Sequence, residues 1–204
     1  MRLARAIAAL GLAALAAVAL AEPYRDDLAL PSYRLLASML TRFHDNSSLD
    51  RAEKALEVIV PLVRALDRKY GTDVEDKLRR AIQTGDRDAA LTATTVLLLL
   101  DTQDLVEGIH RDDYTGWADA KVRARKAFLG YGLVTAELRG GQRELDGRLV
   151  ASLGRLAVEL HGSDMATSPE AIEIARGAVI ADLVELRGAI SRTRPGRADA
   201  GGGE

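Results

Sequence analysis

The sequence predicts an all-α fold, a six- to seven-helix, up-and-down-like bundle around one buried central helix at about residues 87–110. Ala, Leu, Arg, Glu and Asp dominate the composition, and apolar residues recur with the period of a helix along most of the chain. Segment 89–100 reads AALTATTVLLLL, which is apolar on every side once the threonine hydroxyls bond back to the backbone. A helix of that kind has to be surrounded by others.

The first three predicted helices cover residues 31–44, 49–70 and 72–84. The first begins at Pro31, and its apolar stripe consists of Tyr33, Leu36, Leu40 and Phe43. Pro61 lies inside the second and removes one backbone hydrogen bond, which predicts a bend. Thr72 and Glu75 have the spacing of a capping box at the start of the third.

The remaining helices follow the glycine and proline signals. After the central helix, we expect helices at about 115–138, 142–161 and 169–192. Gly140 and Gly141 separate the first two of these, and Ser168-Pro169-Glu170 is a strong helix start with an N-cap and an N1 proline. The short connections predict that sequential helices pack side by side.

The first 21 residues have the three parts of a secretory signal peptide. Arg2 and Arg5 form a positive start, residues 6–20 are uncharged and apolar, and Ala19-Leu20-Ala21 is a small-x-small cleavage pattern before Glu22. The predicted organisation is therefore a cleavable signal at 1–21, one helical-bundle domain at 22–193 and a disordered tail at 194–204. We expect a periplasmic or secreted protein with no membrane span after cleavage.

The charge and the cysteine count exclude several classes of site. The chain has no cysteine, so disulfides, thiolate metal sites and covalent haem attachment are excluded. The formal net charge is −2, and no polybasic block stands out, so nucleic acid is not expected as a partner. Any cofactor would have to be held by histidine and carboxylate side chains.

Acidic residues and a histidine close the fourth predicted helix, namely Asp101, Asp104, Glu107 and His110, followed by Asp112 and Asp113. The row drifts around the helix by about 60° at each step of three residues, so its two ends lie on opposite faces. Glu107 and His110 have the E-x-x-H spacing that places a carboxylate and an imidazole on one metal in carboxylate bundles. These two residues, with Asp112 or Asp113, are the predicted site for a divalent transition metal.

An ordinary helix preference competes with the metal hypothesis. His44, His110 and His161 each fall in the last turn of a predicted helix, where an imidazole meets unpaired carbonyls. In an up-and-down bundle, His110 could approach His161 and Glu159, while His44 lies at the opposite end. Glu159 and His161 are spaced E-x-H, so a second E-x-x-H pair is missing and a di-iron centre is not predicted.

No catalytic motif stands out in the sequence. A G-x-S-x-G elbow, an H-E-x-x-H pair and a Walker loop are all missing. Half of the aromatic residues gather around the fifth predicted helix, where they form core or line a ligand pocket, namely Tyr114, Trp117, Phe128 and Tyr131. We expect an exported, non-catalytic accessory protein that contacts a protein partner in the cell envelope. The alternative is a periplasmic metal- or small-ligand-binding module built on Glu107 and His110.

Overall fold

A computed structural model describes residues 46–112, 116–138, 141–162 and 168–192. Within these residues the chain forms six helices and no strand. They are α3 (Asn46–Tyr70), α4 (Val74–Thr84), α5 (Arg87–Glu107), α6 (Ala118–Leu138), α7 (Arg143–Gly162) and α8 (Pro169–Arg192). The predicted all-α bundle is confirmed. The predicted signal peptide, the helix at 31–44 and the C-terminal tail lie outside the described residues.

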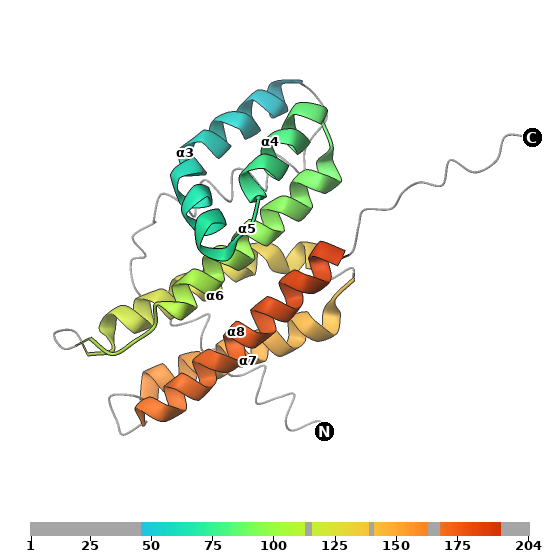
Figure 1. The fold of residues 1–204 in the computed structure, drawn as a ribbon. Helices are drawn as coiled ribbons and strands as arrows, with labels where there is room; N and C mark the ends of the chain where they lie inside the picture. The colour runs from blue at the N-terminus through green and yellow to red at the C-terminus, as the bar shows by residue number, and fades with distance from the viewer. Residues whose placement is uncertain (1–45, 113–115, 139–140, 163–167, 193–204) are drawn as a thin grey trace, which may run out of the picture.

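Helix α5 is the centre of the fold, as its sequence predicted. Figure 1 shows α5 and α6 crossing the middle, with α3 and α4 on one side and α7 and α8 on the other. Its buried residues point in all directions around the helix and include Ala90, Thr94, Leu97, Leu98, Leu99, Leu100 and Val106. The hydroxyls of Thr94 and Thr102 bond back to the carbonyls of Ala90 and Leu98, which removes their need for other partners.

Length and composition alone would allow α5 to cross a membrane. It is the one helix of the described residues that passes this test, and 61% of its most apolar window is buried inside the fold. A core helix passes the same test, because it is apolar on every side for the same reason. The burial of α5 by α4, α6 and α8 therefore accounts for its composition.

Helix α3 is bent, and helix α5 is shorter than the sequence predicted. Helix α3 contains Pro61 and bends part-way along its length (Figure 1), as the sequence predicted. Helix α5 ends at Glu107 rather than near residue 110. Gly108 caps it, with the Gly108 amide donating to the carbonyl of Asp104 and the Ile109 amide to that of Val106. His110 consequently lies beyond the helix.

Candidate functional site

The most connected polar residues of the described chain lie where α3, α5 and α8 meet. We call them the Glu107 cluster, which comprises Lys69, Tyr70, Gln103, Asp104, Glu107, Arg176 and Arg187. Lys69 and Tyr70 form the last turn of α3, and Arg176 and Arg187 come from α8. Of this cluster, only Asp104 and Glu107 were among the acids that the sequence singled out.

The Glu107 carboxylate of α5 uses one oxygen to contact α3 and the other to contact its own helix. Its Oε2 lies 2.7 Å from Lys69 Nζ and accepts a 2.9 Å hydrogen bond from the Tyr70 hydroxyl. Its Oε1 accepts a 2.7 Å hydrogen bond from Gln103 Nε2, one turn earlier on α5. Lys69 also donates to Asp104 at 2.7 Å. Glu107 therefore serves as a link between the end of α3 and the end of α5.

The pKa values of the cluster follow from these bonds. Burial would raise the pKa of Glu107, but hydrogen bonds from Lys69, Gln103 and Tyr70 outweigh it and lower that pKa. Burial would lower the pKa of Lys69, but hydrogen bonds to Asp104 and Glu107 outweigh it and raise that pKa. Burial raises the pKa of Tyr70 to about 12, with a further increase from its bond to Glu107. At neutral pH the three groups stay a carboxylate, an ammonium and a phenol.

Arginines of α8 complete the cluster. Arg187 donates to Gln103 Oε1 at 2.8 Å, and its guanidinium lies over the Tyr70 ring at 5.7 Å from the centroid. The Lys69 ammonium lies over the same ring, 5.0 Å from its centroid, so two cations contact one tyrosine ring. Arg176 donates to the backbone carbonyl of Glu107 at 3.0 Å, which satisfies an end group of α5. Tyr70 thus contacts side chains from α3, α5 and α8.

The residues of the predicted metal site have different surroundings. Glu107 is engaged by α3 as described, and His110 is exposed, with Nδ1 donating to the carbonyl of Gly108 at 2.8 Å. Asp112 pairs through its backbone with Gly116, and Asp113 lies outside the described residues. Since α5 stops at Glu107, the helical geometry behind the E-x-x-H spacing is not formed. Across residues 46–112, 116–138, 141–162 and 168–192, no group of three histidine or acidic side chains could hold a metal.

The aromatic residues in and just before α6 pack against the core. Tyr131 is buried, and its hydroxyl donates to Asp146 of α7 at 2.6 Å. Burial, with this hydrogen bond, raises the pKa of Tyr131. Trp117 and Phe128 are half-buried against the core, which confirms the core alternative for these three residues. Tyr114 lies outside the described residues.

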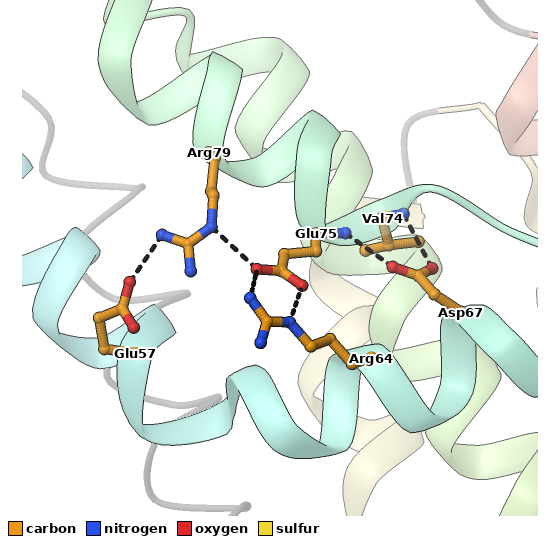
Figure 2. A network of polar contacts seen from close by, with 6 residues as sticks. All are labelled: Glu57, Arg64, Asp67, Val74, Glu75 and Arg79. Atoms are coloured by element: carbon orange, nitrogen blue, oxygen red, sulfur yellow. Dashed lines mark hydrogen bonds and ion pairs between the residues drawn. The ribbon is translucent and has the colours of Figure 1, made fainter.

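A second polar cluster joins α3 to α4 and was not predicted. Figure 2 shows the Glu75 carboxylate between two arginines, with Arg64 donating at 2.7 and 3.0 Å and Arg79 at 2.9 Å. Arg79 also donates to Glu57 at 2.6 Å. Hydrogen bonds from Arg64 and Arg79 lower the pKa of Glu75 against the opposing effect of burial. The cluster ties two antiparallel helices together.

The predicted capping box at Thr72 and Glu75 is wrong. The N-cap of α4 is Asp73, which makes no side-chain cap bond. Asp67 of α3 replaces it, since its carboxylate accepts hydrogen bonds from the Val74 and Glu75 backbone amides at 2.9 and 3.0 Å (Figure 2). The Thr72 hydroxyl donates to the same carboxylate. A capping group from the neighbouring helix has displaced the local one.

A pocket of about 430 Å³ opens beside this second cluster. Its lining comes from the second half of α3 and the start of α4, namely Pro61, Arg64, Asp67, Arg68, Thr72, Asp73, Glu75 and Asp76. Asp67 and Glu75 are already bonded within the fold, and Asp73 pairs with Lys77 at 2.6 Å. The charged residues that line the pocket thus stabilise the contact between α3 and α4.

Comparison of the chain with protein family models, curated proteins and solved structures finds no match. What the site does therefore has to be inferred from the chemistry of its residues. A general acid or base works best with a pKa near neutral, and the pKa values of Lys69 and Tyr70 are displaced away from it. Tyrosine and arginine, both present in the Glu107 cluster, are enriched in protein-binding surfaces.

Proposed function

We propose that this chain is an exported, non-catalytic helical-bundle protein of the cell envelope that works by binding a protein partner. The signal-peptide pattern of residues 1–21 supports the location. The Glu107 cluster supports the binding role, because the Tyr70 hydroxyl is bonded to Glu107 and its ring is contacted by Lys69 and Arg187, which restrains the ring before a partner arrives. Fixing such a ring before binding reduces the entropy lost when a partner docks.

The observation that carries this proposal is a face of α8 that presents the exposed Val184 and the Arg187 that contacts the Tyr70 ring. Ile180, Val184 and Arg187 are spaced i, i+4 and i+7, so they share one face of α8. Val184 is 44% exposed, and Arg187 contacts the Tyr70 ring. Tyrosine and arginine are enriched at binding hot spots, and aliphatic neighbours exclude water around them. The partner we expect is a protein surface with an apolar anchor that fits against Val184 and Tyr70.

A photoreactive amino acid at position 184 tests the proposed surface in living cells. Val122 on α6 provides the matched control, because it is also an exposed valine, at 53%. We expect a crosslinked adduct with a second protein from position 184 and none from position 122, both variants being exported to equal levels. Equal adducts from the two positions, or none from either, would contradict the proposed surface.

One observation favours metal binding as a second candidate function. Because the Gly108 carbonyl can only accept, His110 Nδ1 must carry the proton of that bond, which leaves the Nε2 lone pair of the neutral ring as an acceptor. Metal-binding histidines use this arrangement, with one ring nitrogen donating to a carbonyl and the other bound to the metal. Histidine at the surface, with Asp112 or Asp113 nearby in the sequence, would suit zinc or copper.

The metal candidate predicts a dependence on His110. Titration of the purified chain with Zn²⁺ or Cu²⁺ should show binding that is weakened at least about tenfold in His110→Ala, on the scale of losing one ligand contact. The Glu107→Gln variant should bind as tightly as the parent chain, since that carboxylate is engaged by Lys69 and Tyr70. Equal affinity of the His110→Ala variant and the parent chain would remove the metal candidate.

A further inference from the structure

Helix α8 has an apolar face on the side opposite its buried residues. Ile174 is 59% exposed and Val184 is 44% exposed, and Gly177 and Ala181 between them are exposed as well. At about 100° per residue these four, with Gly188, lie within about 60° of Ala181 around the helix. The exposed side of α8 therefore carries two bulky aliphatic side chains among small residues, which is the composition of a helix-packing surface.

Bulky and small residues on this face are arranged symmetrically about Ala181. Ile174 precedes Ala181 by seven residues and Gly188 follows it by seven, while Val184 follows it by three and Gly177 precedes it by four. If two copies of α8 pack antiparallel about Ala181, each bulky side chain lies opposite a glycine of the other copy. No other side chain lies within 4 Å of the position that a Cβ would take on Gly177. The face is therefore complementary in shape to itself.

The charges at the two ends of α8 have the same symmetry. Glu170 in the first turn precedes Ala181 by eleven residues, and Arg192 in the last turn follows it by eleven, both exposed and on the same face. The antiparallel pairing places Glu170 of each copy beside Arg192 of the other. Glu185, at the edge toward α7, is paired with Arg148 of that helix. The pairing therefore brings opposite charges together at both ends and leaves the Glu185 carboxylate with its own partner.

Helix α7 leaves room for a second helix beside this face. The Ser152 hydroxyl donates to the Asp182 carboxylate, which places Ser152 level with Ala181. On either side of Ser152, α7 has the exposed Ala151 and the half-buried Gly154. No other side chain lies within 4 Å of the position that a Cβ would take on Gly154. Small side chains of this kind allow helices to approach to about 8–10 Å between their axes.

We propose that α8 packs antiparallel against α8 of a second copy of this chain, with Ala181 at the two-fold axis. A symmetric dimer needs a surface that is complementary to itself, and this face is so in both shape and charge. Ile174 of the second copy is then the apolar anchor that lies against Gly188, beside Val184. The inference rests on the proposed function and deepens it, because it names the partner.

A single cysteine at the two-fold axis tests the packing, and the absence of natural cysteine leaves only the introduced thiol. A disulfide forms only when the two Cβ atoms come within about 4.5 Å of each other. Ala181→Cys should therefore form a disulfide-linked dimer on mild oxidation, at least several-fold faster than Ala65→Cys, which replaces an exposed alanine of α3. Equal rates for the two variants would overturn the packing.

Exchanging the end charges tests the register. In sedimentation equilibrium of the purified chain, Glu170→Arg should weaken the dimer several-fold, and adding Arg192→Glu should restore it. Each substitution is unfavourable for the dipole of α8, so recovery in the double variant can come only from the pair across the interface. A double variant that dimerises no better than Glu170→Arg would overturn the register.

The same purified chain separates this inference from the proposed function. A dimer in sedimentation equilibrium, with a position-184 adduct of twice the mass of the chain, supports both. A chain that stays monomeric at every concentration, while position 184 crosslinks to a different protein, overturns the second copy and leaves the proposed partner surface standing.

Discussion

Replacing Leu97 by alanine should lower the free energy of unfolding by about 2–5 kcal/mol, the range for removing a buried leucine side chain. Leu97 is 0% exposed, in the middle of the central helix α5. Its removal leaves a cavity among helices that pack on several sides, which limits how far they can relax into the space. Urea unfolding followed by circular dichroism measures the change.

Val158→Ala is the matched control for this core variant. Val158 lies on α7 and is 62% exposed, so its truncation should change the unfolding free energy by no more than about 0.5 kcal/mol. A loss below about 1 kcal/mol for Leu97→Ala would mean that α5 is not enclosed as described.

Glu107→Gln should lower the unfolding free energy by about 1.5–3 kcal/mol at neutral pH, the range for hydrogen bonds to a charged group. The amide keeps the size of the side chain but removes the negative charge that Lys69 contacts at 2.7 Å. It also places an NH₂ group among the Lys69, Tyr70 and Gln103 donors, which leaves donors without acceptors. Glu53→Gln, an exposed acid elsewhere on α3, controls for the loss of one charge and should have little effect.

The Glu107 carboxylate also predicts that the protein loses stability as the pH falls. The pKa of Glu107 is lowered in the folded chain. The stability that its carboxylate contributes is therefore fully present above the ordinary glutamate pKa of about 4.3, and it is lost as the pH falls through the lowered pKa. The parent chain should therefore lose more stability between about pH 5 and pH 3 than Glu107→Gln does. Equal acid sensitivity of the two proteins would contradict the link between α3 and α5.

The fold could be predicted from the sequence because its signals are local. The all-round apolar segment at 89–100 identified the central helix, and the Ser168-Pro169-Glu170 start placed α8 to the residue. Pro61 likewise predicted the bend of α3. Each of these depends on neighbours within one or two turns of the same helix.

The site could be predicted only in part, since its contacts join residues that are far apart in the sequence. Glu107 was singled out as a metal ligand, but its partners Lys69 and Tyr70 lie on α3, and no local pattern pairs them. Asp67 caps α4 from another helix, which a search for capping residues near Val74 misses. The E-x-x-H spacing does not place Glu107 and His110 on one face of a helix, because Gly108 ends the helix before His110.

The pKa of the Glu107 carboxyl group, measured by carbon-13 NMR titration of the full chain, tests most directly whether this side chain links the helices. Hydrogen bonds from Lys69, Gln103 and Tyr70 predict a pKa below the ordinary glutamate value of about 4.3. Removing one donor with Lys69→Met should move that pKa upwards. A pKa at or above the ordinary value in the parent chain, unchanged by Lys69→Met, would contradict the link.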